Sequence, residues 1–254
     1  MRSVEQWSRR PVVAVTVDVE WAHEIVLRDV ATLLDERGLR ATFFCTHAGV
    51  ELPGHDRALH PNFDRQNNTL FPGGRPPAGW TDGEFHRFVL ESTRRFCPEA
   101  AGIRTHRLYF SSDLLPLYPE NGLEYDSTYF LPLTSGLHPV WKNRDVLELP
   151  VCYLDHWDLN AGATQFELAG LRLDEPGLKV LDFHPNLVYL NAATPEQYAA
   201  SKPRYHDPDH LRAMRHEGRG VRTLFLELLD YLASEAAEWR TLGEINRACR
   251  QEGA

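Results

Sequence analysis

The sequence predicts a single α/β domain whose parallel strands form an open sheet or a barrel. The first reason is length, because 254 residues suit one α/β barrel of about 250 residues. The second is order: a strand at 12–17, a helix at 24–38 and a strand at 39–47 have the spacing of a βαβ unit, whose strands are parallel. The third is that no linker divides the chain.

Each early element follows from its residues. The strand at 12–17, Val-Val-Ala-Val-Thr-Val, is a run of apolar and β-branched residues that suits a buried strand. The helix at 24–38 stops at Gly38 and has apolar residues at helical spacing. The apolar residues are Ile25, Val26, Val30, Leu33 and Leu34. Residues 48–81 are rich in Gly, Pro, Asn and His, and a loop this long in a compact domain is usually functional.

The later elements come from capping signals and apolar runs. Thr81 and Glu84 form a capping box for the helix that follows, and Thr241 and Glu244 form another near the end. Strands are expected at 101–103, 147–154 and 178–183, and helices at 82–96, 221–236 and 241–250. We therefore expect one domain over residues 1–254, with a core at about 11–191 and C-terminal helices at 208–251 packed on it.

Composition excludes some function classes. The net charge of −9 argues against a nucleic-acid backbone or an anionic membrane as main partner. The four cysteines lie far apart with no Cys-x-x-Cys pair, so neither a zinc ribbon nor a disulfide framework is indicated. The N-terminal residues lack a signal-type apolar stretch, and no run of about 18 apolar residues occurs. We expect a cytoplasmic protein without a transmembrane segment.

Five predicted strands end in ionisable or polar residues. In chain order these are Asp18 and Glu20, then His47, then Arg104, Thr105 and His106, then Asp155, His156 and Asp158, and finally His184. Carboxyl ends of parallel strands lie on one face, where ligands bind, so these side chains are expected to converge. Asp18 and Glu20 are two apart, which puts them on the same side if the strand continues. A lone His after a strand is commonly a turn former, and we interpret His47 that way.

The loop at 48–81 carries a second polar cluster. Its segment Gly-His-Asp-Arg-Ala-Leu-His-Pro-Asn-Phe-Asp contains His55, His60, Asn62 and Asp64. Histidine and carboxylate side chains are the ligands of zinc and similar divalent metals. The Asp-x-Glu strand end would add one ligand and a spare base, which favours a metal site over a solvated loop.

These residues give the chain its resemblance to a known family. The chain resembles the polysaccharide deacetylases of carbohydrate esterase family 4, with their nodulation-type deacetylase domain, and in particular a branch found in bacterial surface-glycan gene clusters. The family's five motifs have counterparts, in order, in "TVDVEW", "LHPNFD", "RTHRLYF", "LDHWD" and "LDFHP". The similarity spans roughly residues 12–191. Two positions depart from the pattern: Asp64 stands where a second metal-binding histidine is usual, and His106 replaces a proline.

The resemblance implies a distorted (β/α) barrel and a metal-dependent hydrolase of amide bonds. It implies that Glu20 and His60 bind a divalent cation, with zinc the first choice. Asp64 is expected as the third ligand, and Asn62 is the alternative. A divalent metal would lower the pKa of a bound water and polarise the acyl carbonyl.

The resemblance also assigns the proton transfers. Asp18 is expected to be the general base, held charged and oriented by Arg104. His184 is expected to protonate the leaving amine, since a histidine near its unperturbed pKa suits this task. We also count His106 among the catalytic residues, because a histidine in place of the family's proline is expected to make its own contact in the pocket.

The expected reaction removes an acetyl or formyl group from a small intracellular amino sugar, either free or linked to a nucleotide or lipid. One alternative is a metal-independent amide hydrolase of the same fold, like the relatives that act in allantoin breakdown. Another is a non-catalytic glycan-binding protein. The absent second histidine keeps both alternatives open.

Overall fold

The computed structural model describes residues 9–234 and 237–252. Within these ranges a ten-stranded sheet curves into a half-barrel, which confirms the α/β fold class. The strands are β1 (Pro11–Asp18), β2 (Thr42–Cys45), β3 (Asp56–Leu59), β4 (Gly102–Ile103), β5 (Tyr125–Asp126), β6 (Val140–Trp141), β7 (Leu147–Glu148), β8 (Val151–Leu154), β9 (Gly177–Phe183) and β10 (Glu238–Trp239). Their order is β6-β7-β5-β4-β3-β2-β1-β9-β8, and β10 pairs with β1. Every pairing is parallel except β6 with β7.

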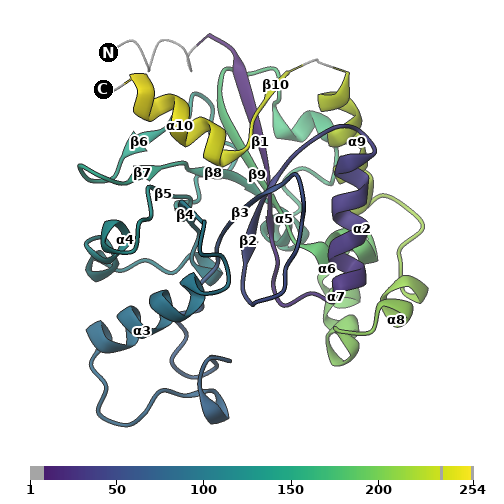
Figure 1. Cartoon of the computed structure of the whole chain (residues 1–254). Coiled ribbons are helices and arrows are strands. Elements are labelled where there is room, and N and C mark those ends of the chain that lie inside the picture. The colour runs from purple at the N-terminus through teal and green to yellow at the C-terminus, as the bar shows by residue number, and fades with distance from the viewer. Residues whose placement is uncertain (1–8, 235–236, 253–254) are drawn as a thin grey trace.

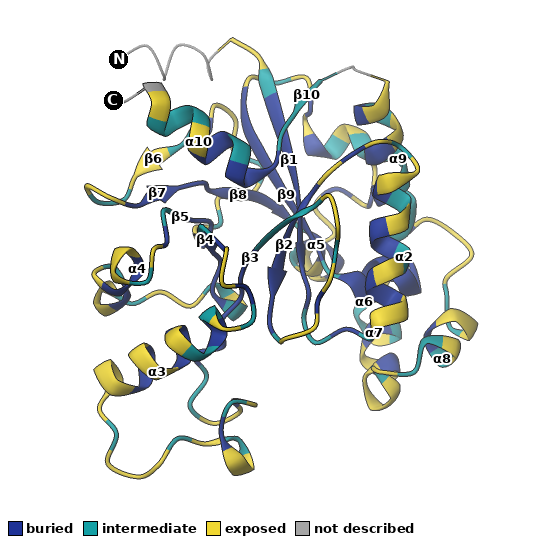
Figure 2. Ribbon diagram, in the orientation of Figure 1, coloured by how far each residue is buried: buried dark blue, intermediate teal, exposed yellow. Residues whose placement is uncertain are grey.

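Helices cover the outer face of the half-barrel and close its amino end. They are α2 (Glu24–Asp35), α3 (Asp82–Arg94), α4 (Leu117–Glu120), α5 (Asp155–Ala161), α6 (Pro185–Leu190), α7 (Pro195–Ser201), α8 (Pro208–Ala213), α9 (Val221–Ala233) and α10 (Leu242–Glu252). Figure 1 shows α2, α6 and α9 gathered beside β1 and β9, whereas α3 and α4 lie beyond β4. In Figure 2 the central strands are buried and the outer faces of the helices are exposed.

Strand β1 explains both the core and the site. Its odd-numbered valines, from Val13 onward, pack in the cluster shared with the helices. Val12 and Ala14 face the interior of the half-barrel, where Leu242 and Ile245 of α10 close the amino end. Farther along this inner face the residues become polar, ending in Asp18. The strand is therefore apolar on both faces until it reaches the carboxyl edge of the sheet.

Several sequence predictions are confirmed. Helix α2 buries Val26, Val30 and Leu34 as expected, although Ile25 is 49% exposed. The Thr81–Glu84 capping box is present, as are the backbone-to-side-chain bonds of the Thr241–Glu244 pair. The late helix predicted at 221–236 ends at Ala233, and residues 235–236 lie outside the described ranges. No helix in the described ranges has the length and apolar character that crossing a bilayer requires.

Two predictions of strands and loops are wrong. The run at 147–154 is not one strand: it splits at Pro150 into β7, which pairs with β5, and β8, which pairs with β9. Proline lacks the N–H that a continuous ladder requires. The loop at 48–81 contains strand β3, whose Asp56 and Arg57 hide the apolar signal of a strand. His60 consequently follows a strand instead of lying within a loop.

Candidate active site

The carboxyl ends of the central strands open into a pocket of about 810 Å³. It is lined by Asp18, Glu20, Trp21, Asn62, Asp64, Asn67, Thr69, His106, Arg107, Leu108, Leu154, His156, Trp157, His184, Tyr198, Lys202, Tyr205 and His206. This volume lies within the range of about 300–1,000 Å³ that is typical of small-molecule sites. The expected convergence of strand ends is therefore what the structure shows for Asp18, His106 and His184.

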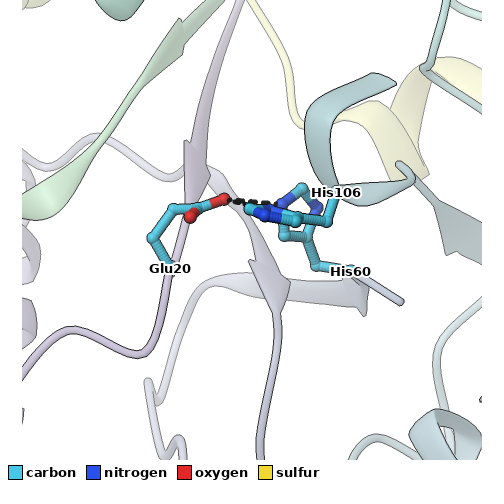
Figure 3. A group of neighbouring side chains, drawn as sticks. All are labelled: Glu20, His60 and His106. Atoms are coloured by element: carbon cyan, nitrogen blue, oxygen red, sulfur yellow. Dashed lines mark hydrogen bonds and ion pairs between the residues drawn. The ribbon is translucent and has the colours of Figure 1, made fainter. Parts of the chain in front are cut away.

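A carboxylate and two imidazoles meet at one side of this pocket. One oxygen of Glu20, Oε1, lies 3.0 Å from His60 Nε2 and 2.8 Å from His106 Nδ1. Figure 3 shows the two rings approaching this oxygen from different segments, His60 after β3 and His106 at the start of a helical turn. The two hydrogen-bond partners outweigh burial and hold the pKa of Glu20 well below its usual value.

The local backbone explains how these three side chains come together. Glu20 lies just beyond β1 in the left-handed region, with a φ of 50°, so its position comes from a turn and not from the strand pleat. Such a conformation is uncommon for a non-glycine residue and often marks a functional site. His60 Nδ1 lies 2.8 Å from the Arg104 carbonyl oxygen, which fixes the ring and leaves Nε2 facing Glu20. A backbone partner on one ring nitrogen is the usual arrangement of a metal-binding histidine.

The donor set fits a divalent metal. Four-coordinate zinc with bonds of about 2.1 Å separates its ligand atoms by roughly 3.4 Å, somewhat more than the 3.0 and 2.8 Å between Glu20 Oε1 and the nitrogens of His60 and His106. Glu20, His60 and His106 offer ligand atoms that all lie within 4.8 Å of one another. Two imidazoles, one carboxylate and access to a pocket match a catalytic zinc site, which keeps a position open.

Asp64 and Asn62 do not join this group. Asn62 Oδ1 accepts a hydrogen bond from the Asp64 backbone N–H (2.9 Å), and Asp64 Oδ1 accepts one from that of Gln66 (2.8 Å). The other carboxylate oxygen of Asp64, Oδ2, lies 3.6 Å from Arg107 Nη1. Both predicted third ligands line the pocket, yet among the described residues it is His106 that faces Glu20 and His60.

Arg104 holds the candidate base. Its side chain is fully buried, and Nη1 donates to Asp18 Oδ1 at 2.9 Å. Nε and Nη2 donate to the carbonyl and hydroxyl of Ser127, and the guanidinium lies 4.1 Å from the ring centroid of Phe44. Burial alone would raise the pKa of Asp18, but the charges of His60 and Arg104 prevail and lower it. Asp18 is therefore ionised and able to accept a proton.

His184 is paired with Asp155, and it offers a ligand atom within 4.8 Å of those of Asp18 and Glu20. His184 Nδ1 lies 2.6 Å from Asp155 Oδ1, and the His184 backbone N–H donates to Asp155 Oδ2 at 2.7 Å. Burial opposes the charged imidazole, but Asp155 outweighs it and raises the pKa of His184 to about 10. The histidine therefore carries a proton at neutral pH, in contrast to the unperturbed pKa that the sequence suggested.

The sequence analysis missed Asp182. This fully buried carboxyl shares Arg104 Nη1 with Asp18 and accepts a hydrogen bond from the Thr16 hydroxyl at 2.7 Å. Its second oxygen has no hydrogen-bond partner among the described residues. Burial raises the pKa of Asp182 to about 8; Arg104 opposes this rise, and the Asp18 charge adds to it. The available signal was its place near the end of β9, two residues before His184, because residues two apart in an extended segment point to the same side.

We predict a pH-dependent gain in stability for Asp182→Asn. Folding raises the pKa of Asp182 from 3.8 to about 8, so the native state retains a proton that the unfolded chain releases. Wild-type protein should lose stability between about pH 4 and pH 8, while an asparagine does not titrate. Urea unfolding measures the free energy of unfolding of both proteins. The value for Asp182→Asn, relative to that of the wild type, should rise by more than about 1 kcal/mol from pH 5 to pH 8. A difference that is equal at both pH values would contradict the assignment.

Comparisons with known proteins concern the family and the fold of the chain. The sequence model of the WbmS-like polysaccharide deacetylases matches residues 15–202. A Bordetella bronchiseptica structure, described as a polysaccharide deacetylase involved in O-antigen biosynthesis, is 28% identical, with a TM-score of 0.74 over 90% of this chain and 93% of that one.

Two more distant structures show the fold alone. A polysaccharide deacetylase from Mycobacterium smegmatis is 16% identical, with a TM-score of 0.59 over 97% of this chain and 92% of that one. A family 4 pseudoenzyme from Bacillus anthracis is 13% identical, with a TM-score of 0.50 over 94% and 66%. The comparison with curated proteins found no match.

Proposed function

Because the chain belongs to the WbmS-like polysaccharide deacetylase family, we propose that it hydrolyses the N-acyl group of an amino sugar with a bound divalent metal. The observation that carries this proposal is the arrangement of side chains around one pocket. Three potential metal ligands lie together there, with the Asp18 carboxylate held by Arg104 and with a protonated histidine, His184. Water, an amide carbonyl and a leaving amine are the three reacting groups of such a hydrolysis, and each has a suitable neighbour here.

Glu20, His60 and His106 are the proposed ligands, so His106 replaces Asp64 in the set that the sequence predicted. When bound, the metal would lower the pKa of a water and polarise the acyl carbonyl. Asp18 Oδ2 lies 3.6 Å from His60 Nε2, so this carboxylate would take the proton of the attacking water. Arg104 supports this by holding Asp18 in one orientation and in its charged form.

His184 is the proposed acid. Its Nδ1 is occupied by Asp155, so the opposite ring nitrogen, Nε2, would donate the proton to the departing amine. Protonation of this nitrogen is needed because an amine anion is a very poor leaving group. Asp155 acts by fixing the ring and sustaining its positive charge.

The substrate is proposed to be an amino sugar or sugar conjugate in glycan biosynthesis, in line with the O-antigen role given for the Bordetella protein. Acetyl and formyl groups are both small enough for this chemistry. The identity of the metal as zinc and the cytoplasmic location stay predictions. The metal-independent alternative drew on the absent second histidine, and His106 supplies a second imidazole beside Glu20.

The direct test is acetate release by purified, zinc-loaded protein from a panel of N-acetylated amino sugars, sugar phosphates and nucleotide sugars. We expect turnover that a strong chelator removes and added zinc restores. Turnover that survives complete removal of metal would instead support the metal-independent hydrolase. Tight binding of a sugar without acetate or formate release would support the glycan-binding alternative.

A further inference from the structure

One wall of the pocket is cationic and aromatic, and the proposed reaction does not use it. This wall consists of Tyr198 in α7, Lys202 in the short helical turn that follows (Lys202–Arg204), Tyr205 and His206. Lys202 Nζ donates to the Tyr198 hydroxyl at 2.7 Å and lies 4.1 Å from the centroid of that ring. It also lies 5.0 Å from the centroid of the Tyr205 ring. Both aromatic rings therefore hold the ammonium group at the pocket.

This wall is attached to the proposed metal centre. The Tyr205 hydroxyl donates to the Glu20 backbone oxygen at 3.1 Å. The His156 ring lies between the wall and the acid, with its centroid 6.0 Å from that of His184 and 5.9 Å from that of Tyr198. Lys202 thus belongs to the side of the pocket where the leaving amine, and hence the sugar, would lie.

Lys202 has no ion-pair partner in the part of the chain that the structure describes. No carboxylate of the described residues lies within 4.0 Å of its ammonium group, whereas neighbouring Arg204 forms an ion pair with Asp207. Packing against the wall lowers the pKa of Lys202, and the Glu20 carboxylate opposes this effect. The Lys202 side chain is exposed and lines the pocket, so a bound ligand can reach its ammonium group and supply the opposite charge.

The charges of the rest of the pocket come close to balance. Asp18 is matched by Arg104, and Asp155 by His184. Asp64 lies 3.6 Å from Arg107. A divalent metal on Glu20 would leave one further positive charge there. The pocket would then carry excess positive charge, which attracts anions and offers nothing comparable to a neutral sugar.

We propose that the substrate carries an anionic group, a phosphoryl or a carboxylate attached to the sugar, and that Lys202 binds it. This inference rests on the proposed function, because it specifies the substrate of the same pocket. The anion belongs to the sugar rather than to the acyl group, since the rings of Tyr198 and His156 connect Lys202 to His184, the proposed acid for the leaving amine. Phosphoryl and carboxylate groups share the chemistry that a lysine recognises, and the test separates them.

The test compares binding of three probes to zinc-loaded protein: N-acetylglucosamine, its 1-phosphate and its uronic acid. Calorimetry in an Asp18→Asn background keeps the probes intact. We expect one charged probe to bind at least about tenfold tighter than the neutral sugar, as one charge-assisted hydrogen bond allows. Whichever charged probe gains identifies the phosphoryl or the carboxylate as the preferred group.

Three further variants assign that gain to Lys202. Lys202→Met should abolish the preference for the charged probe, and Lys202→Arg should keep most of it. Arg204→Met is the matched control: it removes a neighbouring cation that does not line the pocket, and it should leave the preference unchanged. Thermal unfolding checks that each variant is folded.

Two results would overturn the inference. One is equal affinity for charged and neutral probes, which includes no binding of either at millimolar concentration. The other is a preference that persists in Lys202→Met, which would place the anion at the metal. Neither result depends on turnover, so a failure of the proposed function appears separately, as wild-type protein that releases no acetate.

Discussion

Replacing Asp18 with asparagine should lower kcat by about 10²–10⁴-fold, the usual contribution of a general base. Asparagine keeps the shape of the side chain and an oxygen that can accept from Arg104 Nη1, but it cannot take a proton. Asp18 is not among the three proposed ligands, so zinc content should stay near that of the wild type. Kinetics of acetate release and metal analysis on the same preparation provide the two measurements.

A control is needed because Asp18 also faces the buried Arg104 charge. Asp182 remains next to that guanidinium and can ionise to compensate, so the variant should stay folded. Thermal unfolding and circular dichroism check this expectation. A folded Asp18→Asn enzyme with more than about a tenth of wild-type activity would remove Asp18 from the role of base, since base catalysis contributes at least about 10²-fold.

Replacing His106 with alanine should weaken zinc binding by more than the roughly 10–100-fold that loss of an outer partner costs. His106 offers Nδ1 to the same position that Glu20 Oε1 and His60 Nε2 face. Competition with a fluorescent chelator measures the affinity, and acetate release should fall in parallel.

Asp64→Ala is the matched control for this prediction. Asp64 lines the same pocket, and the sequence made it the third ligand, but its oxygens contact Gln66 and Arg107. We expect near wild-type zinc affinity for this variant. The opposite result, with His106→Ala retaining zinc and Asp64→Ala losing it, would restore the ligand set that the sequence predicted.

The sequence could predict the half of the site that follows apolar strands. Asp18, Arg104 and His184 each come directly after a short buried run, and the parallel βαβ pattern places such ends on one face. The fold class needed the same information: alternating strands and helices, with central strands that are apolar on both sides.

The rest depended on how polar segments run in space. Strand β3 has no apolar pattern at Asp56 and Arg57. Its place in the sheet depends on pairing with its neighbours β2 and β4, which the local sequence does not reveal. Asp64 has the sequence spacing of a ligand, but the Asn62 side chain turns the backbone there and directs the carboxylate elsewhere. Asp182 was hidden within an apolar run, where its partner Arg104 is distant in sequence.

The central claim is that one divalent cation binds to Glu20, His60 and His106 beside Asp18 and His184. Anomalous diffraction at the zinc edge, from crystals grown with zinc, tests it most directly. We predict a single peak in the pocket, with Glu20 oxygen, His60 Nε2 and His106 Nδ1 all at about 2.0–2.2 Å. A pocket without a peak, or a peak coordinated by Asp64 in place of His106, would contradict the account.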